Sequence, residues 1–264
     1  MRGLGYLPDP LKQVAEDWSA TELLGAGPIA REASARHLVT DIFDQGALGS
    51  CTANAAMQAV HASHLKQGAP PETPYGSRLF AYYFARATHH ETANDSGTWL
   101  RAVFECMNKF GFCPESLWPY EDGNPGRFQR VPNMAAVRAA FDQHAPTQYR
   151  RIYETGYERV EVIKRAIMAQ HLVCFGTQVT QAFCDDRSAN NGNPIDPPAN
   201  GATLAGGHAM CVGEYTEKDA GIVNSWGRGF GQDGWFRMSW DYIVWNRTAD
   251  LWIVESAPRF SEVP

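Results

Sequence analysis

The chain has 264 residues, 44% hydrophobic and 20% charged, so we expect a globular fold with a full core rather than a disordered chain. Lys and Arg number 23 and Asp and Glu 29, which gives a formal net charge of −6. No basic stripe is visible, and this argues against a nucleic-acid partner. No segment approaches the roughly 18 apolar residues of a membrane span. The N-terminus lacks the apolar run of a secretory signal peptide, so we expect a cytoplasmic protein or one exported by a non-classical route.

Residues 1–36 differ in character from the rest of the chain. Pro and Gly residues punctuate this segment, at positions 8, 10, 25, 27 and 28, and a short helix is predicted over residues 11–24. Two interpretations stay open. The segment is either an ordinary arm that wraps around the domain or an inhibitory segment that covers a cleft.

The next part of the chain predicts helices. Residues 51–66 are rich in Ala and free of Gly and Pro, so we expect a mostly buried helix that begins at Cys51. Gly68, two residues after this segment, is expected to end the helix. Residues 77–86 and 98–110 predict two further helices, and Gly111 is a natural stop for the second.

The second half of the chain predicts strands. β-branched and aromatic residues are frequent in five short segments, at residues 171–179, 209–215, 220–224, 234–238 and 251–254. A polar loop rich in Asn, Pro and Gly spans residues 185–204. Helices first and strands later indicate an α+β protein of two lobes, and a ligand cleft is expected between them.

A cysteine that begins a helix has a feature of a reactive nucleophile. The unpaired N–H groups of the first helical turn place partial positive charge beside the Cys51 sulfur and favour its thiolate. The second feature, a nearby imidazolium, requires one of the eight histidines. None of the six cysteines forms a C-x-x-C pair, and Cys106 and Cys113 are compatible with either a disulfide or two free thiols.

Three ordered motifs resemble those of papain-like cysteine peptidases, in particular bacterial members. They are Gln45-Gly-Ala-Leu-Gly-Ser-Cys51, Gly207-His208-Ala209-Met-Cys-Val-Gly213 and Asn224-Ser225-Trp226-Gly227. The resemblance extends from about residue 37 to residue 254. It implies the two-lobed α+β papain-like fold, with a helical lobe around a central nucleophile helix, an antiparallel β-barrel-like lobe, and an active-site cleft between them.

The resemblance also implies roles for eight residues. Cys51 is the expected nucleophile, His208 its acid–base partner, Asn224 the residue that orients the imidazole, and Gln45 an oxyanion donor. The expected substrate-binding residues are Ser96, Gly97, Gly207 and Trp226. Backbone pairing with Gly97 would hold an extended polypeptide, and Trp226 would cover the bond between His208 and Asn224.

The chain departs from the family pattern at three points. Leu48 stands where the family usually has a cysteine, so the disulfide from that position cannot form. Thr52 replaces the aromatic residue after the nucleophile. His208 and Asn224 lie 157 and 173 residues after Cys51, beyond the usual span of about 130–150 residues. The long loop before His208 would absorb the excess.

Two other sequence patterns are weaker evidence of a functional site. Gly229, Gly231 and Gly234 match G-x-G-x-x-G, but a predicted strand comes after them where a dinucleotide site needs a helix. His61 and His64 lie three apart on a predicted helix, without a spaced third metal ligand. We therefore expect neither a metal nor a cofactor.

The sequence thus predicts an N-terminal extension at residues 1–36, a peptidase domain at 37–254 and a tail at 255–264. Within the domain, residues 37–145 are expected to be mainly helical and residues 146–254 mainly β. The expected function is a cysteine endopeptidase that acts on polypeptides through an acyl-thioester on Cys51. Two alternatives stay open: an acyltransferase or glutamine-modifying enzyme on the same triad, and a catalytically silent peptide-binding protein.

Overall fold

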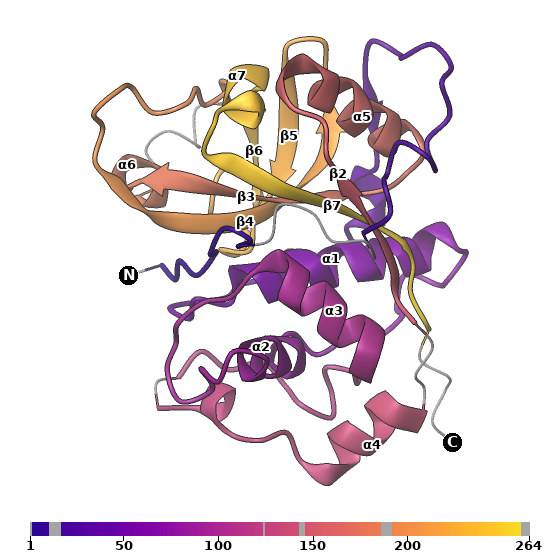
Figure 1. Cartoon of the computed structure of the whole chain (residues 1–264), viewed down its shortest axis with the longest axis vertical. Coiled ribbons are helices and arrows are strands. Elements are labelled where there is room, and N and C mark those ends of the chain that lie inside the picture. Colours follow the sequence, from indigo (N-terminus) through magenta and orange to yellow (C-terminus); the bar gives the residue numbers. More distant parts are fainter. Residues whose placement is uncertain (1, 11–16, 124, 143–145, 186–191, 260–264) are drawn as a thin grey trace.

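The computed structural model describes residues 2–10, 17–123, 125–142, 146–185 and 192–259. The first half of the chain forms most of a helical lobe and the second half a sheet lobe, which lie below and above helix α1 in Figure 1. The helical lobe contains α1 (Cys51–Lys66), α2 (Arg78–Ala87), α3 (Leu100–Phe110) and α4 (Met134–Asp142), with short 3-10 helices at Arg36–Leu38 and Arg127–Gln129. The sheet lobe also carries α5 (Gly156–Met168), α6 (Gln181–Cys184) and α7 (Trp240–Val244).

The strands of the described residues form one antiparallel sheet in the order β2-β7-β3-β4-β5-β6, with β1 paired to β4. Their bounds are β1 (Ala33–Ser34), β2 (Gln148–Ile152), β3 (Val173–Thr180), β4 (Leu204–Tyr215), β5 (Asp219–Val223), β6 (Trp235–Ser239) and β7 (Thr248–Ser256). This arrangement confirms the expected α+β class. One hydrophobic core lies around α1, and a second lies around α5.

Helix α1 is buried on all sides from Cys51 to His64. Small Ala side chains around its circumference let it pack against α2 and α3 on one side and against β3, β4 and β7 on the other. A helix that buries its whole circumference belongs between layers rather than on a surface. The first residue of α1 is therefore fixed where the two lobes meet.

The expected helices at the start of the domain are confirmed, with Ser77 as the N-cap of α2 and Gly111 after α3 at φ +71°. The five expected strands are present as β3 to β7, and β4 begins earlier than predicted. The helix expected over residues 11–24 is wrong for residues 17–24, whereas residues 11–16 lie outside the described residues. Trp18 and Ala20 instead pair with Arg151 on the edge of β2, which uses backbone groups that a helix would need. Helices α4 and α5 and strand β2 were not predicted from the sequence.

Arg86 on α2 holds the loop that leads to one wall of the cleft. Its side chain is 0% exposed, and its guanidinium donates to the backbone carbonyls of Glu91, Thr92, Asn94 and Phe128. The bond to Phe128 is buried and the other three are partly buried, so these carbonyls lose their donor if the guanidinium is removed. Arg86 therefore couples the fold of the helical lobe to the position of the loop.

We expect Arg86→Leu to lower the free energy of unfolding by about 3 kcal/mol, because one buried and three partly buried acceptors are left unpaired. Urea denaturation followed by circular dichroism measures this change. Arg138→Leu is the matched control, because Arg138 is 82% exposed in its pair with Asp142 and surface pairs contribute about 0–1 kcal/mol. Equal effects of the two substitutions would contradict the structural role of Arg86.

Candidate active site

Cys51 begins α1 beneath the groove between the lobes. Its side chain is 0% exposed, and the backbone groups of Ala209, Gly5, Thr52 and Cys51 itself form hydrogen bonds that lower its thiol pKa. The positive end of the helix acts in the same direction. The sulfur therefore lies in a setting that stabilises negative charge locally, although burial opposes it.

His208 on β4 faces Asn224, which comes directly after β5. The Nε2 atom of His208 lies 2.8 Å from Asn224 Oδ1, and the backbone N–H of Ser225 donates to the same oxygen at 2.8 Å. A backbone N–H can only donate, so the atom facing the imidazole is the amide oxygen, and Nε2 carries the proton. Among the described residues Nδ1 of His208 has no hydrogen-bond partner. This nitrogen is available to exchange a proton.

Trp226 covers the His208 ring. The two rings stack with centroids 4.3 Å apart and an interplanar angle of 21°. The guanidinium of Arg2 lies 5.1 Å from the Trp226 ring centroid, and Trp226 itself is 5% exposed. The imidazole is thereby shielded from water, which preserves its bond to Asn224.

Gln45 lies beside the nucleophile loop with its amide oriented by a neighbour. Its Oε1 atom accepts from Ser225 Oγ at 2.6 Å, and its backbone N–H donates to the Ser225 carbonyl at 2.8 Å. The Nε2 atom is thus turned toward the groove, where it donates to the carbonyl of Gly3 at 3.1 Å. It also donates to the Leu48 carbonyl at 2.7 Å. Ser225 was not among the predicted site residues, although its place directly after Asn224 was a signal.

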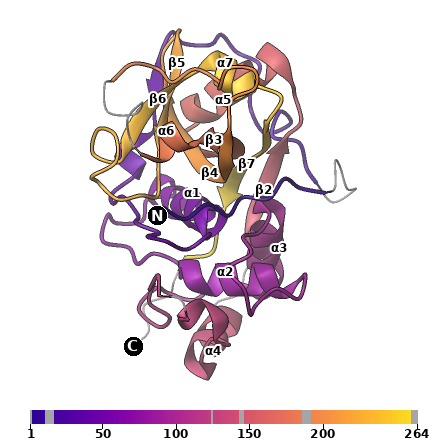
Figure 2. The same cartoon turned by 90° about the vertical axis from the view of Figure 1, so that its left-hand side faces the viewer.

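The groove is filled by the start of the same chain. We call residues 2–10 the N-terminal arm, and Figure 2 shows it as the indigo segment that crosses beside α1 between the strands and the helices. Tyr6 N–H donates to the Gly207 carbonyl at 3.1 Å. Leu7 N–H donates to Thr98 O at 3.1 Å, and Thr98 N–H donates to Gly5 O at 2.9 Å. The arm is therefore held as an extended strand in the groove.

Glycines make this close fit possible. A Cβ on Gly3 would lie 1.9 Å from Leu48 O, and a Cβ on Gly5 would lie 1.8 Å from Gly49 O. On the facing wall, a Cβ on Gly97 would lie 2.1 Å from Gly5 O, and the φ of Gly97 is +72°. No side chain fits at these contacts without displacement of the arm.

Burial in the filled groove keeps Cys51 and His208 neutral. Burial raises the pKa of the Cys51 thiol to about 11 and lowers the pKa of the His208 imidazole to about 4. The bond to Asn224 opposes the shift of His208, whereas the positive charge of Arg2 reinforces it. At pH 7 the covered site therefore holds a thiol and a neutral imidazole rather than the ion pair that cysteine nucleophiles use.

The predicted wall residues are placed at the groove, with one difference in detail. Gly97 and Gly207 contact the arm, but the backbone pairing on the Gly97 side is made by Thr98. Ser96 donates its hydroxyl to the Gly97 carbonyl at 3.3 Å. Asp95, which was not predicted, accepts from the Gly49 N–H at 3.0 Å and so ties this wall to the nucleophile loop.

Other residues with potential chemistry have structural partners. The Nε2 atom of His61 lies 3.1 Å from Thr40 Oγ1, and that of His64 lies 2.8 Å from the Pro258 carbonyl. Cys106 and Cys113 are free and buried, so the disulfide alternative is wrong. Within the described ranges no three His, Cys, Asp or Glu side chains group as metal ligands, and no helix has the length and apolarity to cross a membrane.

The papain family cysteine protease profile matches residues 29–248, most of the chain. The chain belongs to the papain family of cysteine proteases. It is therefore a papain-like cysteine peptidase, a hydrolase of polypeptides, and the family resemblance seen in the sequence is confirmed.

Relatives agree with this assignment. A peptidase C1-like protein of Acanthamoeba polyphaga mimivirus is 34% identical over 220 residues, which cover 81% of this chain and 69% of the viral protein. Xylellain, a cysteine protease from Xylella fastidiosa, superposes with a TM-score of 0.83 at 27% identity and covers 97% of each chain. Digestive procathepsin L2 from Tenebrio molitor, at 16% identity, shares the fold, with a TM-score of 0.70 over 97% of this chain and 78% of its own.

Replacing one glycine of the arm should expose Cys51. We expect Gly5→Val to raise the rate of Cys51 alkylation by iodoacetamide at pH 7 at least about 100-fold, because an uncovered thiol titrates near or below pH 8.5. Mass spectrometry of the Cys51 peptide measures this rate. Gly25→Val is the matched control, since a Cβ on Gly25 meets no atom within 4 Å. Equally slow alkylation of Cys51 in both variants would show that the arm does not cover it.

Proposed function

We propose that the protein is a cysteine endopeptidase that cleaves peptide bonds through an acyl-thioester on Cys51. One observation carries the proposal: a carbonyl oxygen of an extended segment, that of Gly3, already accepts the Gln45 Nε2 hydrogen bond in the groove above Cys51. A substrate carbonyl in the same groove would find the nucleophile, the imidazole and an oxyanion donor together.

These positions define the chemistry. His208 Nδ1 takes the proton of the Cys51 thiol, and the thiolate attacks the substrate carbonyl carbon to form a C–S bond. The carbonyl oxygen gains negative charge and accepts from Gln45 Nε2 and from the Cys51 backbone N–H. The imidazolium then protonates the amide nitrogen as the C–N bond breaks and the amine leaves. Water, deprotonated by His208, hydrolyses the thioester to a carboxylic acid and restores the thiol.

Asn224 and Trp226 support this cycle without taking part in bond exchange. The bond from His208 Nε2 to Asn224 Oδ1 holds the imidazole so that Nδ1 stays turned to the reacting groups. Trp226 stacks on the ring and keeps water from this bond. Both are positioning residues in the proposed mechanism.

Residues 1–36 are proposed to restrain the peptidase domain at 37–254, which precedes the tail at 255–264. The arm fills the groove, uses the oxyanion donor and buries Cys51. Substrate therefore has to displace the arm before it can react. This favours the inhibitory interpretation of the N-terminal extension over that of a simple wrapping segment.

Three substitutions test the proposed nucleophile, acid–base residue and oxyanion donor in a casein-cleavage assay. We expect Cys51→Ala and His208→Ala to abolish cleavage, and Gln45→Ala to lower kcat by about 10²–10³ through loss of one oxyanion donor. Cys113→Ala is the matched control, a buried free thiol outside the groove. Mass spectrometry of the products separates new chain termini from modified glutamine side chains. Casein that gains modified glutamines but no new termini would support the glutamine-modifying alternative.

The restraint by the arm has its own test. We expect Gly5→Val to raise casein turnover by the full-length chain and Gly25→Val to leave it unchanged. Steady-state rates at equal enzyme concentration measure the difference. If neither variant cleaves casein, yet Cys51→Ala still binds peptides, the silent binding protein is the better description.

A further inference from the structure

A small cavity lies between helix α1 and strands β4 and β5, next to Asn224. Its volume is about 10 Å³, which is about the space that one water molecule needs. The polar residues that border it are Asn54, Gln58, Asn224 and Ser225. None of the described residues 2–10 belongs to its walls, so this cavity is separate from the groove in which the arm lies.

Two amide nitrogens of these residues lack a hydrogen-bond partner. Gln58 Nε2 and Asn224 Nδ2 are buried, and neither forms a hydrogen bond within the part of the chain that the structure describes. Both residues are enclosed, because Gln58 is only 4% exposed and Asn224 only 3%. A buried donor that stays unpaired destabilises the folded chain. Since both residues border one cavity, a single acceptor placed there can serve both nitrogens.

We propose that this cavity binds one water molecule, which accepts hydrogen bonds from Gln58 Nε2 and from Asn224 Nδ2. Buried waters make about three hydrogen bonds, and acceptors for the protons of this water border the cavity. Asn54 Oδ1 accepts from Arg78 Nη1 at 3.1 Å, which uses one of the two lone pairs of an amide oxygen. The Ser225 hydroxyl donates its own proton in another hydrogen bond and keeps its lone pairs.

The water makes Gln58 a positioning residue, a role that rests on the proposed endopeptidase function. Asn224 Oδ1 faces His208 Nε2 at 2.8 Å and also accepts from the Ser225 N–H. An amide that turns over exchanges its acceptor end for its donor end. The nitrogen would then face Nε2, the imidazole proton would move to Nδ1, and His208 would no longer accept the proton of Cys51. A water held by Gln58 at the nitrogen end opposes this exchange.

The place of Gln58 in α1 fits this role. Gln58 follows Cys51 by seven residues, so the two side chains lie on the same face of the helix. Ala209 of β4 lies along this face, because its backbone forms a hydrogen bond with the Cys51 thiol and it also borders the cavity. An apolar side chain would fill the space of Gln58 without the cost of desolvating an amide. The buried amide is therefore better explained by a polar partner than by packing.

A crystal structure of the full-length chain tests the water directly. We expect one ordered water within about 3.2 Å of both Gln58 Nε2 and Asn224 Nδ2. Gln58→Met, which keeps the length of the side chain and removes the amide, should lose this water. An empty cavity in the unsubstituted chain, or a direct hydrogen bond between the two amides, would overturn the proposal. Neither result depends on whether the protein cleaves peptides.

A double-substitution experiment tests whether Gln58 acts through Asn224. The chain carries Gly5→Val so that the groove is open, and casein turnover is measured. We expect Gln58→Met to lower kcat about tenfold with KM unchanged, because the substitution disturbs the imidazole and not the substrate site. In a chain that already carries Asn224→Ala, Gln58→Met should have no further effect. Full additivity of the two substitutions, or a change in KM alone, would contradict the positioning role.

Gln67→Met is the matched control. Gln67 follows the last residue of α1, and its amide donates to the Ser63 carbonyl at 3.0 Å, outside the walls of the cavity, so kcat should stay unchanged. If Gln58→Met does not fold, as judged by circular dichroism, the crystal structure of the unsubstituted chain still decides whether the water is bound.

A second readout does not depend on turnover. If the Gly5→Val chain does not cleave casein, the same substitutions are compared by the rate of Cys51 alkylation by iodoacetamide at about pH 6, where the thiolate forms only beside an imidazolium. We expect Gln58→Met to lower this rate severalfold and Gln67→Met to leave it unchanged. An equal rate in the two variants would show that Gln58 does not position His208.

Discussion

The burial of Cys51 and His208 beneath a segment of their own chain determines the state of the site. A thiolate and an imidazolium need water or hydrogen-bond partners to stabilise their charges. The covered groove supplies too little of either. Both shifts, that of the Cys51 pKa to about 11 and that of the His208 pKa to about 4, oppose formation of the ion pair. The favourable helix terminus and the bond to Asn224 are in place but do not prevail while the arm is bound. In the proposed mechanism, activation thus requires a change in the environment of Cys51 and His208 rather than a rearrangement of these residues.

This arrangement depends on a rigid frame around α1. The helix is buried from Cys51 to His64, so packing holds Cys51 in place relative to β4, which carries His208. Asp95 joins the nucleophile loop to the Gly97 wall through the Gly49 N–H, and Ser225 joins Gln45 to the loop of Asn224. The groups that surround the groove are therefore linked across both lobes before any substrate binds.

Local sequence signals were sufficient for the elements around the nucleophile. An Ala-rich run without Gly or Pro defined α1, and Gly111 ended α3 at a positive φ. Local signals failed where pairing with a distant strand determines the backbone conformation. Residues 18–20, for example, join the β2 edge instead of forming a helix. The amphipathic helix α5 was overlooked beside stronger strand signals. The roles of Gly3 and Gly5 were not predicted, because the Leu48 and Gly49 carbonyls that they approach lie more than forty residues away in the sequence.

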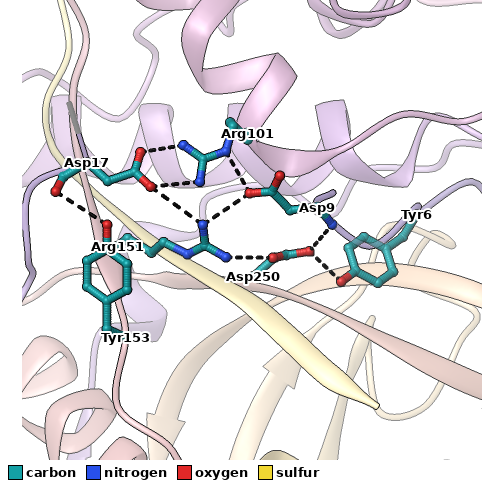
Figure 3. A network of polar contacts seen from close by, with 7 residues as sticks. All are labelled: Tyr6, Asp9, Asp17, Arg101, Arg151, Tyr153 and Asp250. Atoms are coloured by element: carbon teal, nitrogen blue, oxygen red, sulfur yellow. Dashed lines mark hydrogen bonds and ion pairs between the residues drawn. The ribbon is translucent and has the colours of Figure 1, made fainter. Parts of the chain in front are cut away.

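The contact between Tyr6 and Asp250 joins residues 244 apart and has no local signature. It nevertheless holds the arm to the sheet, because the Asp250 carboxylate accepts from both the Tyr6 hydroxyl and the Asp9 backbone N–H (Figure 3). A tethered competitor acts at an effective concentration on the order of millimolar. The arm is tethered where Trp18 and Ala20 pair with β2 and Asp17 bonds Arg101. On the proposed restraint, a substrate would compete with this high local concentration of the arm, and also with the hydrogen bonds that Tyr6 and Asp9 give to Asp250.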